Sequence, residues 1–423
     1  MTKKYLILII LFSLTVAACS QMDTLLSAIP GPDQGIASAS DTPLPEVPTA
    51  AAPTATPGIS HTPTLTHTPK PTRTPRPTFT PSATMPPIVR VGPDNFPDYI
   101  NPLTGLTVIN PALLNRRPMA VKIPNYPHYV RPQSGISLAD HVWEYYLEDG
   151  LTRFIAIFYG NDAIKVGPIR SARIFDEHIM RMYNAIFVFN GADERVLDYY
   201  KEKGLDNDLF VVERECPPLC RDNSISNYNN LFGNTTLISQ YISGHGTDNT
   251  RYDLSSNYFY SLGSRGRDFA SRVYVHYSYA NYAYWEFDNI SHRYLRYQGS
   301  VDLVEGQQEE YTLLTDSLTG YPIAEDNVVI LFVPHEFYFL SSDTEIFSIN
   351  LVDTGKAYVF QTGRAYEALW RREAENKPIS ILLPDGSPFP LKPGTTFFQV
   401  INDTSTTTQN DSVWEFEFVR PEK

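Results

Sequence analysis

The segment Gly167–Arg173, which reads Gly-Pro-Ile-Arg-Ser-Ala-Arg, carries the residues of this chain best suited to bind an anion. Arg170 and Arg173 flank Ser171 at a point where a strand is expected to lead into a helix. A guanidinium group binds carboxylate or phosphate through two parallel hydrogen bonds, and the free N–H groups at a helix start also favour anions. The alternative is that both arginines pair with the protein's own carboxylates. The sequence leaves these two interpretations equally open.

Three carboxylates that recur every four residues are the candidates to accompany the arginines. Asp140, Glu144 and Glu148 would share one face of a helix expected over 137–150, with Ser137 as its N-cap. They could pair with the arginines or act as acid and base, although a solvated charged face is the commoner meaning of such spacing. The sequence contains no nucleophile elbow, zinc-binding helix, phosphate-binding loop or dinucleotide-binding glycine motif. No catalytic residue is therefore assigned, and no metal or cofactor is expected.

The elements around these residues are expected to alternate between strand and helix. The expected strands are 119–123, 154–159 and 185–189, and the expected helices are 137–150, 172–182 and 193–201. This order predicts an α/β N-terminal domain with a mostly parallel sheet, in which ligands bind beyond the carboxyl ends of the strands. Asn125 and Asn190 follow two of these strands, so we expect both at the same edge as the arginine segment.

The pattern changes after residue 270. Short β-branched and aromatic runs, separated by turns rich in Gly, Asp, Asn and Pro, predict a mainly antiparallel, β-rich C-terminal domain. The expected strands are 273–277, 294–297, 328–333, 346–352, 357–361 and 379–383. The aromatic stretch 277–285 would stack on sugar rings if it were exposed, whereas a buried core or sheet face is the commoner outcome.

The N-terminus has the features of an export signal. Lys3 and Lys4 precede the apolar run 5–14, and small residues follow as Val16-Ala-Ala-Cys19. The run is too short to cross a bilayer core roughly 30 Å thick. Because Val-Ala-Ala-Cys resembles a bacterial lipobox, we predict that Cys19 is lipidated. A lipid on Cys19 would anchor the protein at the extracytoplasmic face of the cell membrane. The alternative is an ordinary signal peptide with an accidental cysteine.

A stalk is expected to follow the anchor. Residues 41–88 contain 13 Pro and 13 Thr, so this segment has too little apolar surface to offset the entropy of ordering. The predicted organisation is a lipoprotein signal peptide at 1–19, a disordered Pro/Thr-rich stalk at 20–90, the α/β domain at 91–270 and the β-rich domain at 271–423.

Charge and cysteine content narrow the possible partners. The formal net charge of −13 argues against a nucleic-acid-binding surface. Cys216 and Cys220 lie in Cys-Pro-Pro-Leu-Cys, which predicts a local disulfide in an oxidising compartment. A metal site at these cysteines would need two further ligands nearby, and His245 is the one histidine close in sequence.

The segments that follow the stalk resemble the YerB-like lipoprotein family, whose domain is called DUF3048. The matching stretches are Asn101-Pro-Leu-Thr-Gly105, Arg117-Pro-Met-Ala-Val121 ending in Asn125, Arg131-Pro-Gln-Ser-Gly135, Ala139-Asp140, Glu144, Gly150-Leu-Thr-Arg-Phe154, Gly167–Arg173 and, more loosely, Trp285-Glu-Phe-Asp288, Tyr294, Asn327-Val-Val and Trp370. The resemblance implies an exported two-domain protein and no particular reaction. It adds Arg131 and Arg153 to the anion-binding candidates.

The chain departs from the family pattern at two positions. The family has a histidine where this chain has Phe189, and a second histidine where it has Asn229. Neither Phe nor Asn titrates near neutral pH, so catalysis through these positions is not expected here. Binding through the arginines does not depend on either position.

These observations support a membrane-anchored extracytoplasmic lipoprotein that binds an envelope glycan or envelope protein through an arginine-bearing edge. The expected ligand-binding residues are Asn125, Arg131, Arg153, Arg170, Ser171, Arg173 and Asn190, with Asp140 and Glu144 nearby. The alternative is a hydrolase acting on a cell-envelope polymer, with Glu144 or Asp140 as acid or base.

Overall fold

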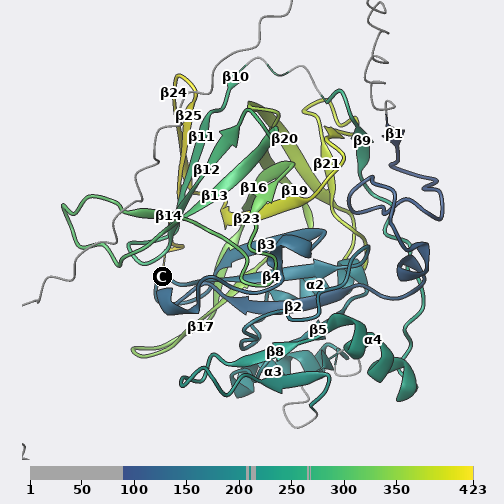
Figure 1. The fold of residues 1–423 in the computed structure, drawn as a ribbon. Coiled ribbons are helices and arrows are strands. Elements are labelled where there is room, and N and C mark those ends of the chain that lie inside the picture. The colour runs from purple at the N-terminus through teal and green to yellow at the C-terminus, as the bar shows by residue number, and fades with distance from the viewer. Residues whose placement is uncertain (1–88, 206–208, 211–215, 264–265, 267, 423) are drawn as a thin grey trace, which may run out of the picture. The chain divides into compact units, whose positions relative to one another are not determined.

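The computed structural model describes residues 89–205, 209–210, 216–263, 266 and 268–422. The predicted signal peptide, Cys19 and the predicted stalk up to residue 88 lie outside the described residues. Over the described residues, the chain forms one large mixed sheet with a second sheet packed against it (Figure 1).

Eleven strands of the described chain form the main sheet: β2 (Met119–Pro124), β3 (His141–Tyr146), β4 (Thr152–Phe158), β5 (Ile186–Val188), β6 (Leu209–Phe210), β10 (Asp268–Phe269), β16 (Asn327–Val333), β19 (Asp353–Gln361), β20 (Arg364–Arg372), β21 (Ser380–Leu382) and β23 (Thr396–Asn402). Their order is β10-β20-β19-β16-β23-β3-β4-β2-β5-β6, with β21 paired to β20. Strands β2, β3, β4, β16 and β23 are buried along their whole length. Their near-continuous apolar runs suit strands that are covered on both faces.

The two halves of the chain meet in the middle of this sheet. Strands β2 to β6 lie on one side and the strands from β10 onward lie on the other (Figure 1). The junction is a parallel pairing of β3 with β23, in which Trp143 lies opposite Phe398. These two rings stack with their centres 4.2 Å apart. One hydrophobic core therefore runs through both halves.

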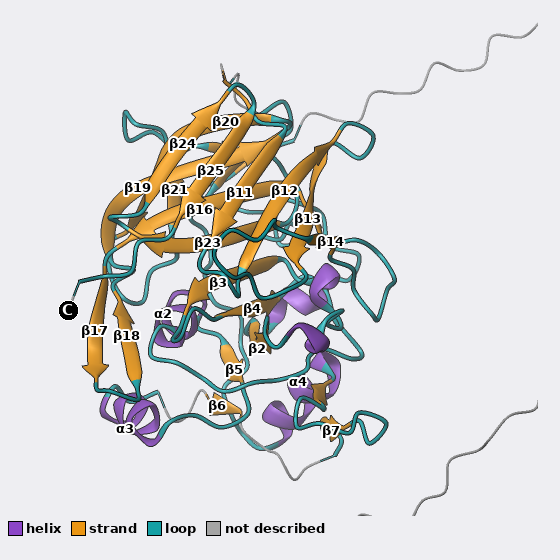
Figure 2. Cartoon of the chain, turned by 90° about the vertical axis from the view of Figure 1, so that its left-hand side faces the viewer, coloured by secondary structure: helices purple, strands orange, loops and turns teal. Residues whose placement is uncertain are grey.

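The second sheet consists of β11 (Arg272–His276), β12 (Tyr282–Asp288), β13 (Arg293–Gly299), β14 (Tyr311–Leu313), β15 (Ala324–Glu325), β24 (Thr406–Asn410) and β25 (Val413–Glu417) (Figure 2). Its inward side chains meet aromatic residues of the main sheet. Trp285 lies edge-on to Phe397 at 4.9 Å, and Trp414 lies 5.8 Å from Phe360. Such alternation of inward and outward side chains is expected where two sheets pack face to face.

Helix α2 covers the opposite face of the main sheet. The described helices are α2 (Asp176–Tyr183), α3 (Glu194–Glu202) and α4 (Thr235–Gly244), with short turns η1 (Pro111–Asn115), η2 (His128–Val130) and η3 (Ile136–Leu138). The Tyr183 hydroxyl bonds His141 Nδ1 at 2.8 Å and accepts from Trp143 Nε1 at 3.0 Å, which fixes α2 on β3. No helix among the described residues has the length and apolar character to cross a membrane.

Smaller elements complete the described chain. They are a three-stranded sheet of β1 (Arg90–Val91), β9 (Tyr258–Tyr260) and β22 (Pro390–Leu391), a hairpin of β17 (His335–Leu340) and β18 (Glu345–Ile349), and a pair formed by β7 (Leu219–Arg221) and β8 (Leu231–Gly233).

The prediction of an α/β N-terminal domain with a mostly parallel sheet is wrong. Strand β4 pairs antiparallel with both β2 and β3. In this part of the described sheet the parallel pairings are β2 with β5, β5 with β6, and β3 with β23. Strands greatly outnumber helices over the described residues, and most of the strand pairs are antiparallel.

The error arises at residues 137–150, which form no α-helix. The run His-Val-Trp-Glu-Tyr-Tyr is strand β3, and it turns at Gly150 into β4 to make a hairpin. Val142 and Tyr146 are four residues apart, a spacing that satisfies the helical period and the strand period alike. The aromatic and β-branched composition, which favours a strand, decides between them. Ser137, the expected N-cap, instead donates its hydroxyl proton to Asp316.

Several element positions were predicted correctly even though their pairing was not. The strands expected at 119–123, 154–159 and 185–189 are β2, β4 and β5, and the helix expected at 193–201 is α3. The helix expected at 172–182 begins later, at Asp176. Strands occupy all six runs predicted after residue 270. The disulfide between Cys216 and Cys220 is confirmed, whereas the domain boundary at 270 stays a prediction.

We expect that residues 89–270 and residues 271–423 do not fold when they are produced separately. Each half would lose the β3–β23 pairing and would expose the faces of strands that are buried in the whole chain. Near-ultraviolet circular dichroism and thermal unfolding of each half measure the outcome, and co-expression of both halves should restore the native spectrum. A cooperative thermal transition in either half alone would contradict this expectation.

Candidate functional site

The arginine segment crosses the carboxyl ends of β2 and β5. The Arg170 backbone N–H donates to the Lys122 carbonyl at 2.9 Å, and the Arg170 carbonyl accepts from the Asn190 N–H at 3.0 Å. The Ala172 N–H likewise donates to the Gly191 carbonyl at 3.0 Å. These bonds place the segment beyond the carboxyl ends of β2 and β5, as the sequence predicted, although β4 runs antiparallel to β2 and β3 is a strand where a helix was expected.

Arg173 is paired inside the protein. Its Nε lies 2.7 Å from Glu148 Oε2, and its Nη2 bonds the other oxygen of the same carboxylate. Its backbone N–H donates to Asp176 Oδ2 at 2.8 Å. This bidentate ion pair fits the alternative interpretation of the sequence, in which the arginines neutralise the protein's own carboxylates.

Arg153 has no such partner. Its side chain is only 8% exposed, and its one hydrogen bond within the described residues runs from Nη1 to the Ser171 carbonyl at 2.5 Å. Burial and the positive charges of Arg173 and Arg170 together lower the pKa of Arg153 to about 9, against the attraction of Glu148. A buried guanidinium that lacks a carboxylate partner is a strong attractor for an anion.

Arg170 likewise forms no ion pair within the described chain. It lies over the ring of Tyr228, with Cζ 4.7 Å from the ring centre. Its Nε is buried and has no hydrogen-bond acceptor among the described residues. Tyr228 is 58% exposed, so this end of the arginine segment reaches the surface.

A buried Lys–Tyr–Asp cluster lies behind the arginines and was missed by sequence reasoning. Lys122 Nζ is 2.7 Å from Asp176 Oδ1, and the Tyr145 hydroxyl donates to the same oxygen at 2.6 Å and also bonds Lys122. Burial lowers the pKa of Lys122 to about 7 despite the attraction of Asp176. All three side chains are closed to solvent, so the cluster positions the arginine segment through the Arg173–Asp176 bond. The sequence contained one sign of this cluster, because Lys122 lies within the otherwise apolar run of β2.

Glu144 lies on the other face of the main sheet, away from Arg153, Arg170 and Arg173. Its Oε2 accepts from Arg296 Nη2 at 2.8 Å and from Gln399 Nε2 at 2.9 Å. Its Oε1 accepts from Asn125 and Thr152, and the carboxylate is 1% exposed. With every lone-pair direction occupied and no access to solvent, Glu144 is a structural anion and not an acid or base.

Asp140 lies apart from both groups, beside the start of β3. Its Oδ2 accepts from the N–H groups of Tyr159 and Gly160 at 2.7 and 2.8 Å, and its Oδ1 accepts from Asn101. Burial raises the pKa of Asp140 to about 6 against these hydrogen bonds. Of the three carboxylates expected to accompany the arginines, only Glu148 contacts one of the predicted arginines.

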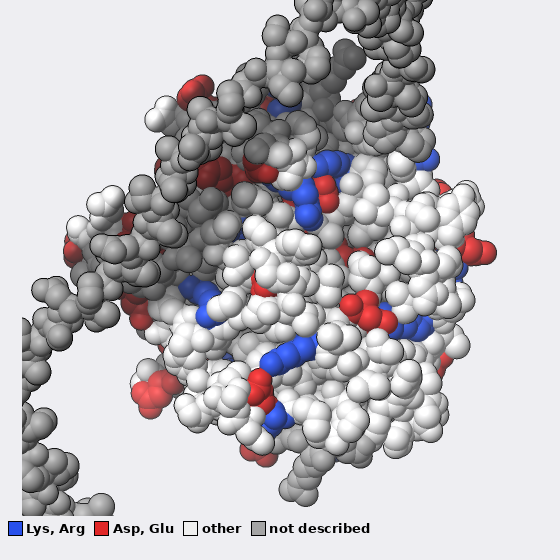
Figure 3. All heavy atoms as spheres, viewed as in Figure 1, with Lys and Arg blue, Asp and Glu red and all other residues white. Residues whose placement is uncertain are grey.

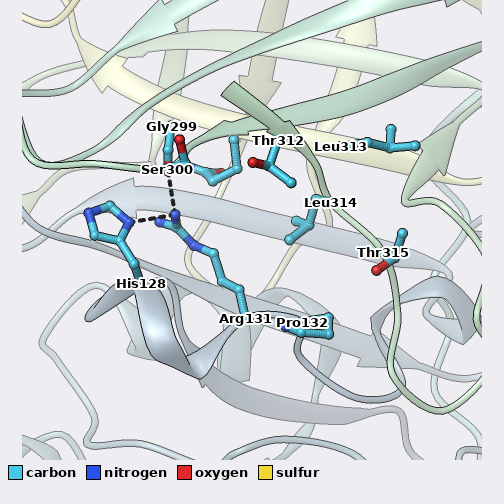
Figure 4. Close-up of a pocket in the computed structure, with 10 residues that line it drawn as sticks. His128, Arg131, Pro132, Gly299, Ser300, Thr312, Leu313, Leu314 and Thr315 are labelled. Carbon is cyan, nitrogen blue, oxygen red and sulfur yellow. Dashed lines mark hydrogen bonds between the residues drawn. The ribbon is translucent and has the colours of Figure 1, made fainter. Parts of the chain in front are cut away.

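Arg131 belongs to the Glu144 side of the sheet and lines a cavity of about 240 Å³ (Figure 4). Its Nε and Nη2 donate to the side-chain and backbone oxygens of Asn125 at 3.2 and 2.6 Å. Its Nη1 donates to the Gly299 carbonyl at 2.6 Å and to His128 Nδ1 at 2.8 Å. The predicted site residues therefore form two groups. Asn125 and Arg131 lie on one face, and Arg153, Arg170, Ser171, Arg173 and Asn190 lie toward the other.

The aromatic stretch 277–285 is divided between the core and the surface. Tyr277 and Trp285 are buried in the core. The ring of Tyr284 stacks on that of Tyr297, with the centres 4.6 Å apart and the planes within 4° of each other, which covers one face of each ring. Tyr279 is 62% exposed, and stacking of this stretch on sugar rings stays a prediction.

We expect Glu144→Gln to lower the free energy of unfolding by about 3–5 kcal/mol, because it leaves Arg296 buried without a compensating charge. Urea denaturation measures the change. The control is Glu286→Gln, which removes one member of an exposed pair with Arg272 and should cost less than about 1 kcal/mol. An equal decrease in the free energy of unfolding in both variants would show that the buried pair stabilises the fold no more than the exposed pair does.

Comparison with known proteins identifies the family. Residues 103–248 match the model described as the N-terminal domain of a protein of unknown function, DUF3048, and residues 273–398 match its C-terminal domain. The Bacillus subtilis (strain 168) protein named "Putative lipoprotein YerB" is 28% identical over 323 residues, which cover 74% of this chain and 88% of that protein. A crystal structure of the YerB protein from Bacillus subtilis has a TM-score of 0.58 and 27% identity, covering 71% of this chain and 96% of that chain. The chain belongs to the YerB-like DUF3048 family.

Proposed function

We propose that this protein is a membrane-anchored extracytoplasmic lipoprotein that binds an anionic group of an envelope glycan or envelope protein through Arg153 and Arg170. The lipobox at Cys19 and the similarity to a relative named as a lipoprotein support the anchor. The observation that carries the binding proposal is the presence of two neighbouring guanidinium groups without ion-pair partners in the described chain.

The surroundings of these two groups suit a carboxylate or a phosphate. Arg153 is nearly closed to solvent, so an anion beside it is screened less than one on an open surface. Arg173 stays tied to Glu148 and adds positive potential without needing to move. The buried Lys122–Asp176 pair fixes the segment from behind, so little conformational entropy is lost when the ligand binds.

The distribution of charge over the molecule favours a local anionic group as the ligand. On the face shown in Figure 3, Lys and Arg occur singly or in small groups, many of them beside Asp or Glu. The formal net charge of −13 repels a polyanion at long range. A single carboxylate or phosphate presented by a largely neutral polymer or protein fits this distribution better than a nucleic acid.

No feature of the described residues favours the hydrolase alternative. It required Glu144 or Asp140 as acid or base, and both carboxylates are buried and saturated with hydrogen bonds. The arginine site holds Glu148 in a bidentate pair with Arg173, which leaves no free base there. Binding is therefore the function that we propose.

We expect Arg170→Ala to abolish co-sedimentation of the purified protein with isolated bacterial cell-wall material while leaving the thermal midpoint nearly unchanged. Arg170 has no ion pair whose loss would destabilise the fold, and its removal takes away one of the two anion-binding groups. The control, Arg272→Ala, removes an arginine of the second sheet that is paired with Glu286, and it should bind normally. Retained binding in Arg170→Ala would refute the proposed site.

We expect Cys19→Ser to move the protein from the membrane fraction to the soluble extracytoplasmic fraction, because serine offers no thiol for the lipid. Fractionation followed by immunoblotting measures the distribution of the protein. Mass spectrometry of the protein with Cys19 intact detects the lipid directly. Ser20→Ala, beside the cysteine, is the matched control and should stay with the membrane. Membrane retention of Cys19→Ser would contradict the lipid anchor.

A further inference from the structure

The cavity beside Arg131 lies where the two family-matched regions meet. One wall is the turn that carries His128, Arg131 and Pro132, and the other walls come from Gln298–Ser300 and Thr312–Thr315 (Figure 4). Its volume of about 240 Å³ is smaller than the roughly 300 Å³ at which sites for drug-sized ligands begin. A single sugar ring or an amino acid is the size of ligand that such a cavity suits.

Arg131 is held rigidly and keeps one donor. An arginine has five N–H groups, and four of those of Arg131 are used by Asn125, Gly299 and His128. The fifth, on Nη2, has no acceptor within the described residues. Because His128 Nδ1 accepts from Arg131, its Nε2 carries the proton and donates to Asp302 at 2.9 Å. This chain of bonds fixes the guanidinium plane before any ligand arrives.

The charge of Arg131 is only partly compensated. The carboxylates whose charge acts on Arg131 are Glu144, which already forms a direct ion pair with Arg296, and Asp302, which bonds the far nitrogen of His128. Burial and the charge of Arg296 together lower the pKa of Arg131 to about 10, against the attraction of these two carboxylates. Neither carboxylate bonds the guanidinium directly, and an anion placed in the cavity would balance its charge.

The remaining walls offer hydroxyl groups and apolar surface. The hydroxyls of Ser300, Thr312 and Thr315 line the cavity and have no hydrogen-bond partner within the described residues. Leu313 and Leu314 line it as well. In Figure 4, Thr312 and Leu314 lie across from the Arg131 guanidinium, so a ligand that reaches both sides would contact charge, hydroxyl and apolar groups together.

We propose that this cavity binds a small hydroxylated carboxylate of the size of one sugar acid. The carboxylate accepts from Arg131, the ligand's hydroxyl groups bond Thr312 and its neighbours, and its carbon skeleton lies against Leu314. This site is separate from the proposed site at Arg153 and Arg170, because Arg131 acts on the Glu144 face of the main sheet and Arg153 acts on the α2 face.

Isothermal titration of the purified full chain with D-glucuronate and with D-glucose tests the proposal. The two sugars differ in the carboxylate, so glucuronate should bind at least about tenfold more tightly, the effect of one hydrogen bond to a charged group. Absent glucuronate binding, or equal affinity for both sugars, would overturn the proposal.

Two variants assign the binding to this cavity. Thr312→Val keeps the side-chain shape and removes the hydroxyl, so it should weaken glucuronate binding about three- to tenfold without lowering the thermal midpoint. The control, Thr406→Val, makes the same change at an exposed position of β24 and should have no effect. The titration is repeated in Arg170→Ala, which removes the other proposed carboxylate site, so the glucuronate binding that remains belongs to the cavity. Loss of binding in Arg170→Ala, or full affinity in Thr312→Val, would place the sugar acid elsewhere and overturn the proposal.

Discussion

The buried ion pair between Glu144 and Arg296 is the interaction on which the two-sheet architecture depends. Glu144 lies on β3 of the main sheet and Arg296 on β13 of the second sheet, and both side chains are essentially closed to solvent. Two buried charges cost several kcal/mol each to desolvate, so the pair is stable only if further bonds satisfy it. Gln399 completes the carboxylate, and three aromatic rings surround the guanidinium within about 5 Å: Phe154, Trp285 and Phe397. The Glu144–Arg296 pair therefore links the second sheet to strands β3 and β23, where the two halves of the main sheet meet.

The use of the buried carboxylates in such ion pairs also determines which arginines have no ion-pair partner. Because hydrogen bonds from Arg296, Gln399, Asn125 and Thr152 saturate Glu144, its carboxylate acts on Arg131 only from a distance. On the other face of the main sheet, Glu148 is taken by Arg173, and Arg153 is left with a backbone carbonyl. Among the described residues, each face thus keeps at least one arginine without an ion pair, namely Arg131 on one face and Arg153 and Arg170 on the other. These local positive charges lie on a protein whose formal net charge is −13.

The sequence located several of the main elements but did not pair them. Apolar runs marked β2, β4 and β5, and the helix expected at 193–201 is α3, whereas strands such as β12, β20 and β23 were not predicted. Hydrophobic periodicity did not identify the strand within 137–150, because a strand buried on both faces shows no alternation of polar and apolar residues. The ion pair of Glu144 could not be predicted either, since its partner Arg296 lies 152 positions away. Which arginines form ion pairs could likewise not be predicted from residues close to them in the sequence. The Glu148 partner of Arg173 lies 25 residues away along the chain, and the absence of a partner for Arg153 follows only from three-dimensional packing.

Perturbed pKa values often identify catalytic groups. His276, whose pKa is raised, is only partly buried and lines a separate cavity. Six other groups with shifted values are closed to solvent, namely Lys122, Asp140, His141, His178, Glu325 and His335. His178, for example, bonds Arg372 in the core, a contact between residues 194 positions apart. Burial is the largest cause of each shift, and none of these groups contacts the open cavity at Arg131. The side chains that line this cavity include Arg131 and three hydroxyl groups, which can orient and hold an anion.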